Sequence, residues 1–127
     1  MKKSLSSRLK RSIDFWSIPH FLFGSVMALV AASFEYPFPA TFAVTLVVAI
    51  LWERFEQEEG IKESIHNRMA DVVLPLIAFV ATYFYTHLVA IEHERRIALL
   101  TVVTLVFFLV NYLGWRARAA RDRDFMN

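Results

Sequence analysis

The sequence predicts an all-α integral membrane protein: a bundle of four transmembrane helices, preceded by an amphipathic interfacial helix, with both termini in the cytoplasm. Hydrophobic residues make up 57% of the 127 residues, against roughly 45–50% in a typical soluble protein. They are gathered into four long apolar stretches separated by short charged ones, which is the pattern of a multi-pass membrane protein. The absence of cysteine excludes disulfides, thiolate metal sites and cysteine nucleophiles.

The first element is expected at residues 1–14. Leu5, Leu9 and Ile13 lie four residues apart and are surrounded by basic residues. A helix with this pattern has one apolar and one cationic face, which favours a position on the cytoplasmic leaflet.

The four spans are expected at residues 15–34, 39–55, 70–91 and 97–115, each close to the roughly 20 residues that cross a bilayer core. Pro39 suits the first turn of the second span, because the N–H that it lacks would have no partner there. The connections at 34–38 and 92–96 are short, so each pair of spans should form an antiparallel hairpin. The transmembrane domain therefore covers residues 15–115, and a basic cytoplasmic tail follows at 116–127.

Lysine and arginine are unequally divided between the two sides of such a bundle. Four spans place the amino-terminal segment, the middle loop and the tail on one side, and that side holds every basic residue except Arg95 and Arg96. Basic residues accumulate on the cytoplasmic side of membrane proteins. Trp16, Trp52 and Trp115 are expected at the same interface.

Each span also carries a polar residue near its cytoplasmic end. Because polar groups in apolar surroundings are costly unless they are paired, we expect these side chains to face one another. The spacing of Glu63, Asn67 and Asp71 forms a stripe if the third helix begins near Lys62. We therefore predict one site for a divalent cation or a cationic group, built from Glu53, Glu56, Asn67 and Asp71 with His20 nearby, and supported by Glu63, His66 and Asn111.

Oxygen ligands of this kind suit Mg²⁺, Ca²⁺ or Mn²⁺, whereas a histidine shifts the preference toward Mn²⁺, Fe²⁺ or Zn²⁺. On balance Mg²⁺, Mn²⁺ and Ca²⁺ are expected ahead of Zn²⁺. Arg54 and Arg68 are the internal cations that could neutralise the cluster instead. Arg54 is one residue from Glu53 and so points about 100° away around the helix, and Arg68 likewise turns away from the stripe.

Small residues share the polar faces and should lie inside the bundle, where they allow helices to pack closely. Large apolar residues, Leu29 and Phe79 among them, are expected on the opposite, lipid-facing sides. The small residues in question are Gly24, Ala28, Ala49 and Ala78.

The motif Trp52-Glu53-x-x-Glu56, followed by Glu63-Ser-x-x-Asn67-x-x-x-Asp71, resembles the signature of a family of small, uncharacterised bacterial inner-membrane proteins. That signature is Trp-Glu-x-x-Glu, then Asp-Ser-x-x-Asn-x-x-x-Asp, with a histidine and a glycine in the first span. The chain departs from it at Glu63, at Gln57 and in a shorter loop. The resemblance covers about residues 16–82 and implies a bacterial inner-membrane location, a shared fold and a shared polar site, without an activity. The corresponding histidine and glycine are His20 and Gly24.

Three classes of function fit these observations, and they leave open whether the protein is an enzyme. One is metal-dependent chemistry on a lipid head group, another is an oligomeric ion channel or transporter, and the third is a structural or regulatory membrane subunit. The inward faces carry no charge beyond the cytoplasmic third until Glu92, which weakens transport. The expected partners are the lipid bilayer, a lipid substrate, and further copies of the chain or a larger membrane complex. The basic tail is interpreted as a topology signal resting on anionic lipid, so nucleic acid is not expected.

The orientation is testable with reporter fusions. A reporter placed after Asn127 should report the cytoplasm, and one inserted within residues 92–96 should report the opposite side, because of the biased distribution of lysine and arginine. Matching reports from the two positions would contradict the four-span topology.

Overall fold

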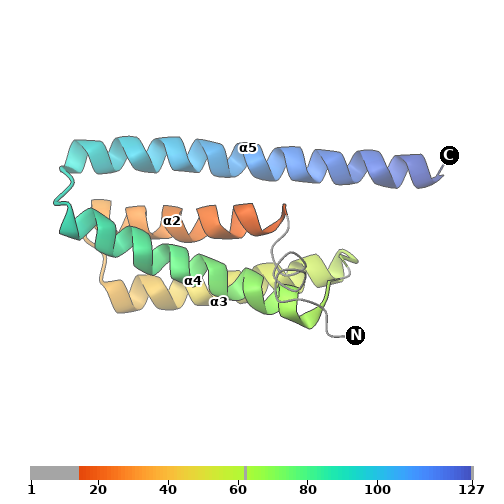
Figure 1. Cartoon of the computed structure of the whole chain (residues 1–127), viewed down its shortest axis with the longest axis horizontal. Coiled ribbons are helices and arrows are strands. Elements are labelled where there is room, and N and C mark those ends of the chain that lie inside the picture. The colour runs from red at the N-terminus through yellow and green to blue at the C-terminus, as the bar shows by residue number, and fades with distance from the viewer. Residues whose placement is uncertain (1–14, 62, 127) are drawn as a thin grey trace, which may run out of the picture.

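The computed structural model describes residues 15–61 and 63–126. In this part of the chain it contains four long helices joined by short turns (Figure 1). All four are long and apolar enough to cross a membrane, which confirms the expected set of four spans. The interfacial helix expected at 1–14 lies outside the described residues. The helices are α2 (Ser17–Phe34), α3 (Phe38–Glu58), α4 (Ile65–Leu88) and α5 (His93–Met126).

Two tight turns close the hairpins at one end of the bundle. After α2, Glu35 adopts a left-handed conformation with φ 56°, and the N–H of Tyr36 donates to the carbonyl of Ala31 at 3.0 Å. This backward hydrogen bond satisfies a carbonyl that the end of the helix would otherwise leave unpaired. Ala90, with φ 49°, takes the left-handed position in the turn between α4 and α5.

The opposite end of the bundle holds the start of α2, the end of α3 and the start of α4, and it is called the loop end below (Figure 1). Here α4 begins at Ile65, because the hydroxyl of Ser64 caps it by accepting a hydrogen bond from the N–H of Asn67 at 3.2 Å. The third span therefore begins five residues before the expected position and ends at Leu88. Glu63 precedes the helix, so the expected stripe along one helix face contains only Asn67 and Asp71.

The fourth helix is much longer than expected. Helix α5 continues through the basic segment to Met126 and extends past the other helices at the loop end (Figure 1). The end of the membrane span at residue 115 stays a prediction. Alanine and arginine are strong helix formers, and residues 116–126 contain neither glycine nor proline to end the helix. At 1.5 Å per residue this helix is about 50 Å long, which exceeds the roughly 30 Å of a hydrocarbon core.

Helix α2 is the centre of the bundle and contacts each of the other three helices. Its closest approach is to α4 at Gly24, where a Cβ atom would lie 2.0 Å from the carbonyl oxygen of Pro75. The two helices run in the same direction, and their backbones touch because Gly24 has no side chain. The expected interior positions are confirmed: Gly24 is buried, and Ala28, Ala49 and Ala78 each have an exposed fraction of 0%.

Two residues assigned to the lipid-facing sides are instead in the core. Leu29 is 3% exposed and Phe79 is fully buried. Phe79 packs edge-to-face against Phe38 and Phe42, with ring centroids 5.4 and 5.7 Å apart. Leu29 is buried because other helices surround α2 on several sides. Phe79 is buried because aromatic side chains of α3 cover the face of α4 that carries it.

The contact at Gly24 predicts that a side chain at this position forces α2 and α4 apart. Gly24→Leu should lower the free energy of unfolding by about 1–3 kcal/mol, as overpacking does in close-packed cores. The measurement is thermal unfolding of the purified protein in detergent, with Ala81→Leu as the control because Ala81 is an exposed small residue of α4. Equal melting temperatures for the two variants would place Gly24 outside the packed interface.

Candidate cation site

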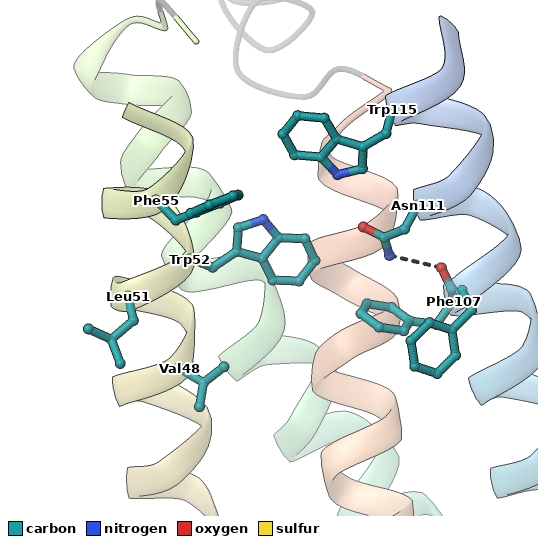
Figure 2. Close-up of a pocket in the computed structure, with 8 residues that line it drawn as sticks. Val48, Leu51, Trp52, Phe55, Phe107, Asn111 and Trp115 are labelled. Carbon is teal, nitrogen blue, oxygen red and sulfur yellow. Dashed lines mark hydrogen bonds between the residues drawn. The ribbon is translucent and has the colours of Figure 1, made fainter. Parts of the chain in front are cut away.

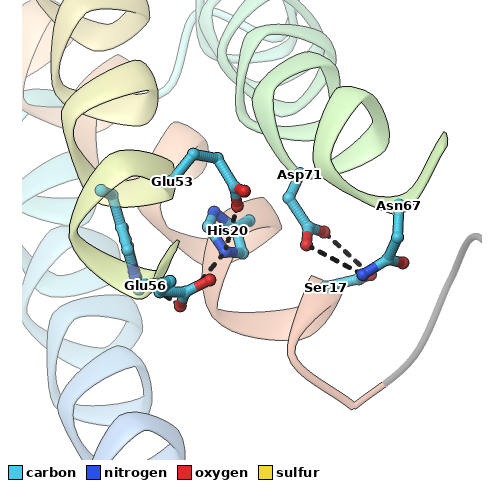
Figure 3. Close-up of polar contacts among 7 residues, drawn as sticks. Ser17, His20, Glu53, Glu56, Asn67 and Asp71 are labelled. Atoms are coloured by element: carbon cyan, nitrogen blue, oxygen red, sulfur yellow. Dashed lines mark hydrogen bonds and ion pairs between the residues drawn. The ribbon is translucent and has the colours of Figure 1, made fainter. Parts of the chain in front are cut away.

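A cluster of six buried polar side chains lies between α2, α3 and α4 near the loop end (Figure 3). None of the six is more than 5% exposed. Figure 3 shows His20 between the two glutamates of α3 on one side and Asp71 of α4 on the other. The six residues, called the polar cluster below, are Ser17, His20, Glu53, Glu56, Asn67 and Asp71.

The imidazole of His20 faces both glutamates of α3. Its Nε2 atom lies 3.6 Å from Oε1 of Glu53 and 3.8 Å from Oε1 of Glu56. Glu53 and Glu56 are three residues apart, so both project from the same side of α3. The two distances exceed those of a hydrogen bond, so the three side chains surround a common space without closing it.

Trp52 positions this half of the cluster. Its indole N–H donates to Oε1 of Glu56 at 2.7 Å, and its ring lies against the imidazole of His20 with centroids 4.4 Å apart and planes inclined by 33°. One bulky side chain thus orients a carboxylate and holds the plane of the imidazole. Both contacts restrict the rotamers of groups that a cation would use.

Asp71 is positioned by two neighbours on the other half of the cluster. The hydroxyl of Ser17 donates to Oδ1 of Asp71 at 3.1 Å, and the amide of Asn67 donates to Oδ2 at 3.4 Å. Asn67 lies one helical turn before Asp71 on α4, whereas Ser17 lies on α2. The carboxylate is therefore held across the interface between these two helices.

Several buried atoms of the cluster have no hydrogen-bond partner among residues 15–61 and 63–126. Buried polar atoms in proteins are almost always paired, and an unpaired one costs about 1–3 kcal/mol. Atoms without hydrogen bonds on both glutamates and on the imidazole that lies beside them are the arrangement expected of a ligand site. The unpaired atoms are Nδ1 and Nε2 of His20, Oε1 of Glu53, Oε2 of Glu56 and Oδ1 of Asn67.

The two buried glutamates also lack a basic partner. Among residues 15–61 and 63–126, no lysine or arginine lies within ion-pair distance of Glu53 or Glu56; His20 is their only such contact. Arg54 is exposed and Arg68 is half-buried, and neither forms an ion pair with these glutamates. This agrees with the expectation that both arginines turn away from the cluster.

The spacing of the donor atoms suits a metal ion. One ligand atom each from His20, Glu53 and Asp71 lie within 4.8 Å of one another, and so do one each from Glu53, Glu56 and Glu63. Ligands at about 2.1 Å from an octahedral ion are about 3–4.2 Å apart. Small rotamer changes would bring the first set to that spacing. Glu53 belongs to both sets and is the natural centre of the site.

The structure separates the three residues expected to support the site. Glu63 is half-buried beside the two glutamates of α3. His66 is exposed on the first turn of α4, so it lies outside the cluster. Asn111 lies on α5, where its amide donates to the carbonyl of Phe107 at 2.8 Å.

Asn111 instead faces an apolar groove of about 680 Å³ between α3 and α5 (Figure 2). Trp52 forms a wall of this groove and also contacts the polar cluster, so its ring separates the two environments. The walls of the groove are mainly aromatic and aliphatic, formed by Val48, Leu51, Trp52, Phe55, Phe107, Phe108 and Trp115.

Sequence reasoning missed two contributors. Ser17 lies three residues before His20, on the same face of α2, and this spacing was an available signal. Trp52 is expected at the membrane interface and in the Trp-Glu-x-x-Glu motif, without a role in the cluster, and its hydrogen bond to Glu56 follows from a spacing of four residues. Its contact with His20 depends on how α2 and α3 pack, which no local pattern specifies.

Comparison with known proteins gives no further assignment: no family model, no curated protein and no solved structure matches the chain. The chemistry of the polar cluster is therefore the basis for a functional proposal.

Proposed function

We propose that the protein is a multi-pass inner-membrane protein of bacteria, with both termini in the cytoplasm, whose polar cluster binds one divalent cation for chemistry on a lipid head group. The observation that carries this proposal is that buried nitrogen and oxygen atoms of His20, Glu53, Glu56 and Asn67 form no hydrogen bond within the described part of the chain. A cation between His20 and the glutamates would bind one imidazole nitrogen and the free carboxylate oxygens, and it would neutralise the glutamates at the same time.

The donor set favours Mn²⁺ or Mg²⁺. Carboxylate and amide oxygens suit Mg²⁺, Ca²⁺ and Mn²⁺, and the single imidazole of His20 moves the preference toward Mn²⁺. Zinc in proteins is commonly held by cysteine or by several histidines, and His20 is the only histidine in the cluster. In the proposed site Glu53, Asp71 and His20 are direct ligands, and Ser17 and Trp52 orient the carboxylates.

A purely structural cluster explains these contacts less well. Polar groups that serve helix packing pair with one another across the interface, as Ser25 and Thr82 do at 3.2 Å. The glutamates of α3 instead carry buried oxygens that accept no hydrogen bond from the described part of the chain. Such an arrangement costs stability unless something absent from the polypeptide completes it.

Conduction through a single copy is also disfavoured. Directly beyond the polar cluster, the described part of the core is filled by Ala28, Ala49, Ala78 and Phe79, none of which has any exposed surface. A cation at the cluster would meet an apolar plug. This favours a site that works from the cytoplasmic interface, where lipid head groups lie.

Thermal unfolding in detergent, with and without added metal, tests the proposal. Mn²⁺ or Mg²⁺ should stabilise the wild-type protein over the EDTA-treated sample, by about 2.7 kcal/mol when the metal is at 100 times its Kd. Glu53→Gln and Asp71→Asn should remove this metal-dependent stabilisation. Glu58→Gln should retain it, because Glu58 is an exposed carboxylate of the same helix.

The same variants separate a metal site from a structural ion pair. In EDTA, Glu53→Gln should be at least as stable as the wild type, because it removes one of several crowded, buried negative charges. Loss of a structural ion pair with His20 would instead cost about 3–5 kcal/mol. That loss, together with no shift for the wild type in Mg²⁺, Mn²⁺, Ca²⁺ or Zn²⁺, would overturn the cation site.

A further inference from the structure

A second cavity, of about 420 Å³, lies between α3 and α4 and reaches Glu53 of the polar cluster. It is distinct from the aromatic groove between α3 and α5. Its lining changes character along the helices. Toward the loop end it contains the polar side chains of Arg54, Gln57 and Arg68 beside the apolar Ile65 and Met69; toward the middle of the bundle it is apolar, with Ile50, Val72 and Val73.

The two arginines of this cavity are available for a ligand. The side chains of Arg54 and Arg68 form no hydrogen bond or ion pair within the described part of the chain, and the Nε atom of Arg68 is buried there without a hydrogen-bond partner. A guanidinium group is a planar donor that matches the oxygens of a phosphate. Two such groups on neighbouring helices, lining one cavity, form a receptor for a phosphate group.

The apolar half of the cavity indicates that the phosphate belongs to a lipid. Ile50 and Val73 are 44% and 45% exposed, and they lie about one turn farther from the loop end than the arginines of their own helices. An occupant with its phosphate at Arg54 and Arg68 would lay an apolar chain along these residues, parallel to the membrane-spanning direction. A free phosphate ion would leave the apolar half of the cavity empty.

We propose that this cavity binds the phosphate-bearing head group of a membrane lipid, with the phosphate between Arg54 and Arg68 and the first part of an acyl chain on Ile50 and Val73. Glu53 lines the cavity and also belongs to the polar cluster, so the bound phosphate lies beside the proposed cation. This inference names the substrate class and rests on the proposed function for that cation, while the arginine contacts depend only on the cavity.

The placement of the arginines agrees with a role in binding the phosphate, separate from the carboxylates that bind the cation. If Arg54 and Arg68 served to neutralise the carboxylates, they would point at Glu53 and Glu56. They line a neighbouring space instead, one that shares Glu53 as a wall. A cation on one side of a phosphate and two guanidinium groups on the other would balance its charge from both directions.

The test measures binding of defined probes to the full-length protein in detergent, by native mass spectrometry and thermal shift. The probes are dioleoyl phosphatidic acid, dioleoylglycerol, which has the same chains without phosphate, and glycerol 3-phosphate, which has the phosphate without chains. Each is measured in EDTA and in Mn²⁺. The variants are Arg68→Gln and the double variant Arg54→Gln/Arg68→Gln, with Arg116→Gln as the control because Arg116 is an exposed arginine of α5 outside the cavity.

Phosphatidic acid should bind the wild type at least about tenfold more tightly than either of the other probes, since one charge-assisted hydrogen bond contributes roughly a factor of ten. The double variant should lose at least that factor, and Arg116→Gln should bind as the wild type does. The inference would be overturned if dioleoylglycerol or glycerol 3-phosphate bound the wild type as tightly as phosphatidic acid does. It would also be overturned if the double variant bound phosphatidic acid as tightly as the wild type does.

The two proposals fail in different ways. Arginine-dependent binding of phosphatidic acid in EDTA, without any metal shift in the wild type, would overturn the cation site and support the lipid cavity. A metal shift that depends on Glu53, without arginine-dependent lipid binding, would support the cation site and overturn the lipid cavity. Intact folding of each variant is checked by its elution volume and helical content.

Discussion

The contact between Gly24 and Pro75 sets the geometry of the rest of the structure. It brings the backbones of α2 and α4 together, and the two helices run in the same direction from the loop end. His20 lies four residues before Gly24, and Asp71 lies four residues before Pro75. One helical turn from the contact, the two side chains therefore meet at the same depth, and Ser17 reaches Asp71 one turn farther. The position of the polar cluster along the bundle thus depends on Gly24, which has no side chain.

Burial of the polar cluster lowers the stability of the fold, and this cost points to a ligand. Glu53 and Glu56 are almost completely buried and have no basic partner other than His20 in the described part of the chain. The single N–H of Trp52 pairs with Oε1 of Glu56, and Oε2 forms no hydrogen bond in that part of the chain. Natural proteins keep such unfavourable arrangements chiefly at functional sites, where the cost is offset when a ligand binds. Arg68 of the α3–α4 cavity fits the same account, because its buried Nε atom has no hydrogen-bond partner in the described part of the chain.

The sequence predicted the number of helices and the interior positions of Gly24, Ala28, Ala49 and Ala78, because hydrophobic length and small-residue spacing are local signals. It also indicated that Arg54 and Arg68 turn away from the carboxylates, which follows from the 100° rotation between successive helical residues. Leu29 and Phe79 were misplaced because a helix pattern cannot tell how many neighbours surround it. The separation of Asn111 from the polar cluster depends on how α5 packs on the bundle, and the continuation of α5 to Met126 reflects helix propensity beyond the apolar stretch.

The central claim is that His20 and the carboxylates hold one metal ion, and pulsed electron paramagnetic resonance of the protein loaded with Mn²⁺ tests it most directly. The account predicts one bound Mn²⁺ per chain, with electron spin echo modulation from a directly bound imidazole nitrogen. That modulation should disappear in His20→Gln and persist in His66→Gln, because His66 lies outside the polar cluster. A spectrum of free aqueous Mn²⁺, or nitrogen modulation that His20→Gln leaves unchanged, would contradict the account.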